Sequence, residues 1–452
     1  MNTTQLTVSA QYVAQAQEAS RILASMSSET KNLLLHAMAE GLLAQEVRLL
    51  EANARDLTEA QAYHLSTSSM ARLKLDRAKL AQLAQGIREV AKLPDPSGRR
   101  LTHLKLDDEL ILEKVTCPLG VILIIFESRP DALPQILSLM LKSGNAVLFK
   151  HGKESTHTCK ALMDAVMAPL CKLVPQLPTY WAQAIETREM VSELLKMSHG
   201  IDLVIPRGSN ALVQHIMQHT SIPVLGHADG VCHMYLHPSA NLDIALPVIV
   251  DAKVQYPAAC NALETLLIDQ ACPVDKVCQW LATEGMTRGI THFRVPPELA
   301  CYFPEAHTTV LPSYTEHTPS ETLEALWHVE HGEPTLAIRC VETLEGALHH
   351  IARFSSKHTE GILATDPIAI QQFLEGVDAS SVMVNASTRF ADGFRYGLGA
   401  EVGISTSKTH ARGPVGLEGL VSTRFIVQGA GHLVADYVGH PSLRQFQHTS
   451  LL

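Results

Sequence analysis

The sequence predicts an α/β protein with two domains of comparable size, each built on a parallel sheet. Its 452 residues are enough for two or three domains, and its 46% hydrophobic and 18% charged content is that of an ordinary globular protein. Short apolar runs alternate with helical patterns along most of the chain, which is typical of βαβ units. The alternation comes in two blocks, with a break near Asp243. No internal repeat interrupts it.

The part of the chain before the first block predicts helices and then a hairpin. From Val8 to Ala91 apolar residues recur at intervals of three and four, which is the period of an amphipathic helix. The stretch "LTHLKLDDELILEKV" alternates apolar and polar residues on both sides of Asp107 and Asp108, which predicts a β-hairpin at 101–116. An isolated hairpin needs a partner surface to be stable.

The composition favours a protein that acts on small molecules. The formal charge of -10, from 36 Lys+Arg and 46 Asp+Glu, is spread along the chain without a basic run, so neither nucleic acid nor an anionic membrane is expected as a partner. The longest apolar run, "LGVILIIF", is far shorter than the ~20 residues that span a bilayer. The first residues, "MNTTQLTVSAQ", lack the pattern of a signal peptide, and a cytoplasmic location is expected.

The nine cysteines are an odd number without a CxxC pair, which predicts reduced thiols and no metal site. One of them stands out in "VQYPAACNALETLLI", residues 254–268. If the residues after Cys260 begin a helix, the helix dipole would favour its thiolate. "ETLLI" is equally typical of a strand, and a small buried thiol without a chemical role is the alternative interpretation.

The segment "IPRGSN" at 205–210 ends a predicted strand just before a helical pattern. Gly208 and Ser209 would then offer free backbone N–H groups to a phosphate. A simple turn with Ser209 as the N-cap is the alternative.

Longer motifs resemble a known family. They are "CPLGVILIIFESRPD", "SGNAVLFKHGKE", "GHADGVCHMY", "YPAACNALETLL" and "VNASTRFADGFRYGLGAEVGISTSKTHARGPVGLEGL". In this order, and over nearly the whole chain, they are similar to the γ-glutamyl phosphate reductase family of the aldehyde dehydrogenase superfamily. The similarity extends to the reductase half of the bifunctional pyrroline-5-carboxylate synthase of eukaryotes.

The resemblance implies an aldehyde dehydrogenase-like fold, with two Rossmann-like three-layer α/β/α domains and a small β-flap for oligomerisation. The expected dinucleotide-binding domain comprises 1–100 and 117–242, and the expected catalytic domain comprises 243–420. The expected flap and tail are 101–116 and 421–452, which would give the isolated hairpin its partner.

The resemblance also implies a chemistry. Cys260 falls at the family's nucleophile, which would attack L-γ-glutamyl 5-phosphate, form a thioester and yield L-glutamate 5-semialdehyde after hydride transfer from NADPH. Hydrolytic relatives stabilise the oxyanion with an asparagine where "FESRP" has Ser128. Ser128 and Asn261 are therefore the candidates for that role. His227 falls where those relatives carry the glutamate that activates water.

Further site residues follow from the same resemblance. For NADPH/NADP the candidates are Lys150, Lys153, Gly208, Ser209 and Glu330. For the substrate they are Arg129, Asn385, Arg389 and Arg412, and no metal is expected.

Two other functions remain open on the sequence alone. One is an acylating aldehyde dehydrogenase that takes a coenzyme A thioester. The other is an inactive relative that binds glutamate kinase. A homo-oligomer, dimer or tetramer, is expected in each case, and an active enzyme would also be a possible partner of glutamate kinase.

Overall fold

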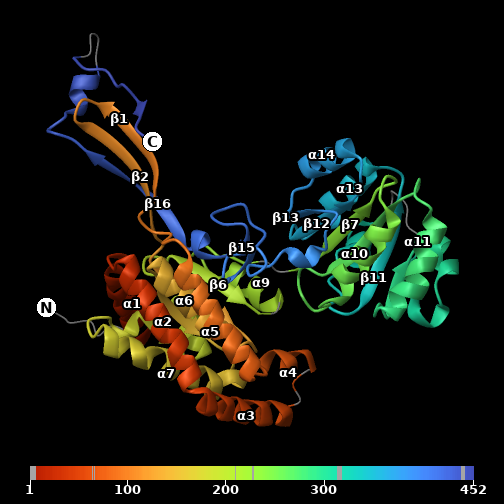
Figure 1. Ribbon diagram of the computed structural model, residues 1–452, viewed down its shortest axis with the longest axis horizontal. Helices are drawn as coiled ribbons and strands as arrows, with labels where there is room; N and C mark the ends of the chain where they lie inside the picture. Colours follow the sequence, from red (N-terminus) through yellow and green to blue (C-terminus); the bar gives the residue numbers. More distant parts are fainter. Residues whose placement is uncertain are drawn as a thin grey trace.

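The structure is a computed structural model that describes residues 7–63, 65, 67–208, 210–226, 229–312, 318–438 and 443–452. Two α/β bodies lie side by side, and a β-ribbon projects from one of them (Figure 1). The predicted α/β class is confirmed, with helices on the faces of two parallel sheets. No helix in these described ranges combines the length and the apolar character needed to cross a membrane.

The first domain is built on a four-stranded parallel sheet of order β5-β4-β3-β6. Its strands are almost entirely buried because helices cover both faces. The strands are β3 (Val121–Phe126), β4 (Ala146–Lys150), β5 (Ala182–Ala184) and β6 (Leu203–Arg207). The helices are α1 (Val8–Ala24), α2 (Ser28–Ala44), α3 (Glu46–Ala62), α4 (Thr67–Leu73), α5 (Arg77–Lys92), α6 (Ala132–Ser143), α7 (Thr156–Leu173), α8 (Arg188–Leu194) and α9 (Asn210–His219).

The second domain has a seven-stranded parallel sheet of order β10-β9-β11-β8-β7-β12-β13. The strands are β7 (Cys232–Leu236), β8 (Leu263–Asp269), β9 (His292–Val295), β10 (Thr308–Val310), β11 (Thr335–Val341), β12 (Thr359–Leu363) and β13 (Ser381–Val384). The helices are α10 (Leu242–Val254), α11 (Val274–Trp280), α12 (Ser320–Trp327), α13 (Leu344–Phe354) and α14 (Pro367–Gly376). Short apolar strands and amphipathic helices alternate as the sequence predicts.

The predicted domain boundaries are wrong in two places. Strand β7 was assigned to the first domain, but it pairs with β8 and β12 in the second sheet. Residues 400–420 were assigned to the catalytic domain, but Ala400, Val402 and Leu420 pack in the core of the first domain. This return segment carries β14 (Gly403–Ser405) and β15 (Gly413–Val415), which form a two-stranded sheet. Hydrophobic period alone does not tell which core a short apolar run will join.

The hairpin expected at 101–116 is present as β1 (Arg100–Asp107) and β2 (Leu110–Pro118). It joins the C-terminal strands β16 (Val421–Gln428) and β17 (Thr449–Ser450) in an antiparallel sheet of order β16-β2-β1-β17. We call this four-stranded sheet the flap. It projects away from both domains (Figure 1).

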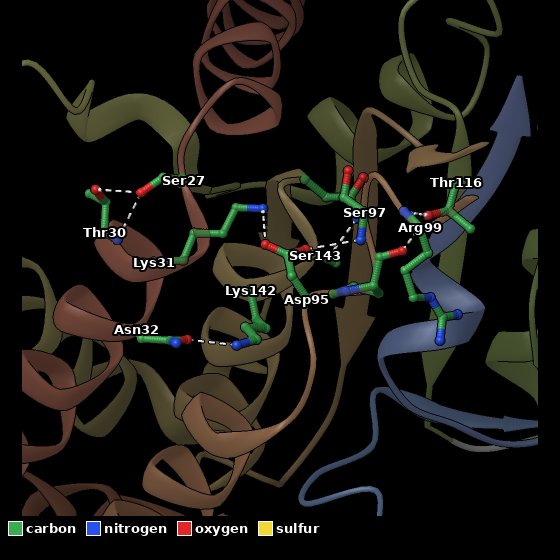
Figure 2. Close-up of polar contacts among 12 residues, drawn as sticks. Ser27, Thr30, Lys31, Asn32, Asp95, Ser97, Arg99, Thr116, Lys142 and Ser143 are labelled. Atoms are coloured by element: carbon green, nitrogen blue, oxygen red, sulfur yellow. Dashed lines mark hydrogen bonds and ion pairs between the residues drawn. The ribbon is translucent and has the colours of Figure 1, made fainter. Parts of the chain in front are cut away.

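Buried polar contacts fix the base of the flap, and Figure 2 shows them. The Lys31 ammonium in α2 is almost completely buried and lies 3.0 Å from an Asp95 carboxylate oxygen in the link from α5 to β1. The other oxygen of Asp95 accepts the Ser97 N–H at 2.9 Å. Lys142 in α6 is also buried and donates to the Asn32 side chain at 2.6 Å. The link is therefore held by full hydrogen bonding of groups that would be costly to bury unpaired.

Candidate active site

A cavity of about 400 Å³ lies where the two domains meet, and Cys260 lines it. The first domain contributes Ser128 and Arg129 from the end of β3, and Arg207 from the end of β6. Because β3 and β6 are neighbouring parallel strands, their carboxyl ends lie at the same edge of the sheet, where ligands bind in open α/β folds. Glu401, from the return segment, completes the wall.

A second hollow of about 540 Å³ lies between the end of α2 and α7. Its charged side chains are Arg48, Asp164 and Lys172. Arg48 and Asp164 form an ion pair at 2.7 Å, and the expected nucleophile is not among the lining residues. The cavity around Cys260 is therefore the one that bears the predicted chemistry.

Cys260 lies in a tight turn between α10 and β8. Backbone hydrogen bonds close the turn, from Ala259 N to Tyr256 O at 3.1 Å and from Ala262 N to Ala259 O at 2.9 Å. Of the two structures the sequence left open after Cys260, the strand is the correct one, because β8 begins at Leu263 and is buried along its whole length. The thiol therefore does not lie at a helix N-terminus.

The segment that leads into and begins β7 packs against this turn through Gly230 and Cys232. A Cβ atom on Gly230 would lie 2.2 Å from the Cys260 carbonyl oxygen and 2.4 Å from its Cα, so only glycine fits. The Cys232 thiol donates to the same carbonyl oxygen at 3.3 Å. Burial raises the pKa of Cys232 well above its usual range, which keeps it a neutral donor.

Glu330 lies on the other side of Gly230 and also lines the cavity. Its carboxylate accepts the Gly230 N–H at 2.9 Å. Glu330, which the resemblance assigns to the nicotinamide ribose, is thus hydrogen-bonded to Gly230. Gly230 in turn packs against the backbone of Cys260, the expected nucleophile.

The two candidates for oxyanion stabilisation have their donors engaged elsewhere. The Ser128 hydroxyl donates to Glu154 at 2.9 Å, and the Ser128 N–H donates to the same carboxylate oxygen. Its φ of 49° is a conformation that a serine rarely adopts. The Asn261 amide donates to the Ala391 carbonyl at 2.8 Å and is 3% exposed. Ser128 lines the cavity. Asn261 instead anchors the turn to the loop after β13, which contains Ala391.

The cofactor candidates divide into two groups. Gly208 lines the cavity, and a Cβ there would lie 2.7 Å from Leu212 and 2.8 Å from Glu127. Lys150 is the last residue of β4 and Lys153 follows the strand at the same sheet edge, but neither lines the cavity. Lys150 donates to the His151 carbonyl, and burial lowers its pKa. Ser209 lies outside the described residues, as does His227.

The substrate candidates are not all brought together. Arg129 lines the cavity. Arg389 is 8% exposed and donates through Nε to the Gln255 side chain at 2.9 Å, with its guanidinium over the Tyr256 ring. It lies close enough to Cys260 for their charges to interact.

Asn385 and Arg412 are engaged in structural contacts instead. The Asn385 side chain both accepts from Ala364 N at 2.9 Å and donates to Ala364 O at 2.7 Å, which ties β13 to the end of β12. Arg412 lies 2.8 Å from Asp378, and Lys357 and Lys408 approach the same carboxylate. The Arg412 hydrogen bond is the largest cause that lowers the pKa of Asp378 to about 2.

Arg207 and Glu401 are site residues that the sequence analysis did not single out. Arg207 Nη1 lies 3.4 Å from the Glu401 carbonyl oxygen, and Nη2 lies 4.0 Å from its carboxylate. Burial raises the pKa of Glu401, and Arg207 opposes that change. The signal in the sequence was the segment "IPRGSN", which ends a predicted strand and contains Arg207, the last residue of β6.

Comparison with known proteins shows the family of the chain. Residues 3–284 match the model of the aldehyde dehydrogenase family. The chain is 46% identical to a γ-glutamyl phosphate reductase of Synechococcus sp. (strain JA-3-3Ab), covering 97% of this chain and 93% of the relative. It is 44% identical to the enzyme of that name from Methanosarcina mazei, covering 97% and 96%.

A solved structure supports the same assignment. The crystal structure of γ-glutamyl phosphate reductase from Thermotoga maritima superposes with a TM-score of 0.85 at 32% identity, covering 94% of this chain and 99% of that one. The chain therefore belongs to the aldehyde dehydrogenase family and, within it, to the γ-glutamyl phosphate reductases.

Proposed function

We propose that this chain reduces L-γ-glutamyl 5-phosphate to L-glutamate 5-semialdehyde and phosphate with NADPH, the second step of proline biosynthesis from glutamate. The observation that carries the proposal is that Cys260 shares one cavity with three guanidinium groups, those of Arg72, Arg129 and Arg207. A thiol supplies the nucleophile for acyl transfer, and guanidinium groups suit an anionic substrate. The names of relatives at 42–46% identity support the choice of substrate.

In the proposed reaction the Cys260 thiolate attacks the acyl carbon of the substrate. The new S–C bond forms, the C–O bond to phosphate breaks, and phosphate leaves with that electron pair. The bound cofactor supplies a hydride to the thioester carbon. The resulting thiohemiacetal then releases the aldehyde and restores the thiolate.

The oxyanion formed at each step needs a donor in the cavity. The hydroxyl of Ser128 and the amide of Asn261 already donate to Glu154 and Ala391. The backbone N–H of Cys260 is a further candidate, because it belongs to the same residue as the thiol.

The residues present fit a dinucleotide. Lys150 is half-buried at the end of β4, and within the described residues it makes no ion pair, so its charge can serve a ligand. Gly208 lines the cavity, and a side chain there would collide with Leu212 and Glu127, so the backbone itself forms the wall at this point. We propose that Lys150 binds the adenosine ribose, that Lys153 binds the 2′-phosphate of NADPH, and that Glu330 holds the nicotinamide ribose.

The proposal extends to assembly. Apolar side chains on the flap are exposed, among them Phe425 at 64% and Val427 at 57%. An exposed apolar edge strand is normally covered in the functional protein. We therefore propose a homo-oligomer held together through the flap. A cytoplasmic location and an association with glutamate kinase remain expectations from the sequence.

The decisive test runs the reaction in reverse. L-glutamate 5-semialdehyde and NADP should give NADPH only when phosphate is added, because phosphate must attack the thioester. Dependence on coenzyme A in place of phosphate would favour the acylating alternative. No turnover with either would favour an inactive binding partner.

A variant tests the nucleophile. Cys260→Ala should retain the fold and lose reductase activity, because alanine is small enough for the turn but carries no thiol. Activity above a few per cent of wild type would contradict the thioester route. Cys301→Ala, at an exposed thiol, is the matched control.

A further inference from the structure

The carboxyl ends of β3 and β6 place two arginines in the same cavity. Phe126 of β3 is aligned with Arg207 of β6, and the Glu127 N–H donates to the Arg207 carbonyl at 3.1 Å. Arg129 follows two residues after Glu127. The register of these two strands therefore brings Arg129 and Arg207 to the same sheet edge, where both line the cavity, and their charges repel each other.

The Arg207 side chain contacts Glu401, but no close ion pair neutralises its positive charge. Its side chain is 14% exposed, and its one hydrogen bond among the described residues is the long contact of 3.4 Å with the Glu401 carbonyl. The Glu401 carboxylate, at 4.0 Å, is at the limit of an ion pair. A guanidinium has five N–H donors, so this single hydrogen bond leaves most of the donors of Arg207 without an acceptor among the described residues, and Arg207 lines the cavity.

Arg129 is less restrained still, since no carboxylate of the described residues lies within ion-pair distance of it. Two neighbouring guanidinium groups cost electrostatic energy unless an anion lies between them. The cavity also contains Arg72 and the carboxylates of Glu127, Glu330 and Glu401. Among the described residues none of these carboxylates is closer to Arg207 than 4.0 Å or pairs with Arg129, so a dianion can still bind between the two guanidinium groups. Phosphate suits this position because guanidinium groups bind its oxygens in pairs.

Cys260 is the third member of this arrangement. It lines the same cavity, and its charge interacts with that of Arg207. The other two candidate arginines are engaged elsewhere, Arg389 with Gln255 and Arg412 with Asp378.

We infer that Arg207 and Arg129 form the subsite for the phosphoryl group, so that the acyl carbon of the substrate faces the Cys260 thiol. The inference rests on the proposed function and specifies which residues recognise phosphate. When the thiolate attacks, the departing phosphate already lies against both guanidinium groups, which stabilise its growing charge. In the reverse direction the same subsite positions inorganic phosphate for attack on the thioester.

The reverse reaction separates this inference from a general loss of substrate binding, because it divides the substrate into semialdehyde and phosphate. Arg207→Met should raise the KM for phosphate about tenfold to a hundredfold, the usual effect of losing a charged hydrogen bond. The KM values for semialdehyde and NADP should stay within about twofold of wild type, an amount below a typical binding contribution. Arg207→Lys keeps the charge but loses the planar, bidentate guanidinium group, so its KM for phosphate should lie between those of the wild type and Arg207→Met.

Arg48→Met removes an exposed arginine from the other hollow and is the matched control. If Arg207→Met is too unstable to assay, the wild-type enzyme gives a second measurement. Inorganic phosphate should slow alkylation of Cys260 by iodoacetamide, and sulfate at the same ionic strength should do so less.

The outcomes are distinct. A wild-type enzyme with no phosphate-dependent NADP reduction would remove the proposed function itself. Phosphate dependence in the wild type, combined with an unchanged phosphate KM in Arg207→Met, would remove the subsite alone. A rise in the KM for NADP instead of phosphate would place Arg207 in the cofactor site and would also overturn the inference.

Discussion

Lys253 Nζ lies 2.7 Å from Glu264 Oε2, and the two residues bound the turn that carries Cys260. Both side chains are fully buried. Lys253 is in the last turn of α10 and Glu264 is the second residue of β8, so the ion pair fixes the distance between the two ends of the turn. Burial raises the pKa of Glu264 to about 7, although Lys253 opposes that change.

Removal of one partner from this pair should be costly. Lys253→Met leaves a buried carboxylate without its cation, and we expect the free energy of unfolding to fall by about 3–5 kcal/mol. The double variant Lys253→Met/Glu264→Met should recover most of that loss, since two apolar side chains replace two charges. Denaturant unfolding measures both. Arg48→Met, which breaks an exposed pair, should cost below about 1 kcal/mol.

The single variant should also depend on pH. Without Lys253 the pKa of Glu264 rises further above its unfolded value of 4.5, so the folded state binds the extra proton. Its stability should therefore fall as pH rises from 6 to 8, by up to about 1.4 kcal/mol per pH unit. A pH-independent loss, or one no larger than that of Arg48→Met, would show that the pair does not secure the turn.

Gly230→Ala should disable the enzyme without touching any reacting group. The new methyl would overlap the Cys260 backbone, so either the turn or the start of β7 must move. We expect kcat to fall by about a hundredfold, as for other small misplacements of catalytic groups, with a stability loss of about 1–3 kcal/mol. Gly346→Ala, in α13, meets its nearest atoms at 3.8 Å and should leave kcat unchanged. Wild-type kcat in Gly230→Ala would refute the packing argument.

Lys153→Glu should change cofactor preference. The proposed 2′-phosphate contact is worth roughly 1–3 kcal/mol, or about tenfold to a hundredfold in kcat/KM for NADPH over NADH. The variant should lose that preference and keep its NADH activity. Lys160→Glu makes the same charge reversal at an exposed position of α7 and should keep the preference. A wild-type enzyme that used NADH as well as NADPH would rule out the assignment.

His331 should make the protein sensitive to acid. Burial is the largest cause that lowers its pKa from 6.5 to about 4, and Lys253 adds to it. The unfolded chain therefore takes up a proton first, so stability is complete above about pH 6.5 and is lost as pH falls towards 4. Between pH 7 and 5 the wild type should lose about 1–2 kcal/mol more than His331→Asn. Equal losses in the two proteins, measured by denaturant unfolding, would contradict this assignment.

The flap should carry the oligomer contact. Phe425 and Val427 lie on one face of β16, an edge strand, and both are exposed. Wild type should sediment as a dimer or tetramer at micromolar concentration, and Phe425→Glu/Val427→Glu should shift it towards the monomer, because buried charges oppose association. Ser422→Glu, on the other face of the strand, should not. A monomeric wild-type protein would contradict the proposed oligomer contact through the flap.

The sequence by itself determined most of the helices and strands, and it predicted Cys260 as the reacting group. Amphipathic periods predicted the N-terminal helices, and alternation of apolar and polar residues predicted the hairpin. Short apolar runs predicted the buried strands. Each pattern indicates which side of an element is buried away from water. The family resemblance of the motif around Cys260 predicted the nucleophile. These properties are local, so a window of a few residues contains them.

Only the tertiary structure determines which residues share the cavity with Cys260. Arg207 and Arg129 come to the same sheet edge only through the register of β3 with β6. Asn385 and Arg412, equally plausible from their motifs, are engaged by Ala364 and Asp378. The side chain that a charged group meets depends on contacts distant in sequence. Hydrophobic period therefore predicts the scaffold, but long-range pairing selects the members of the site.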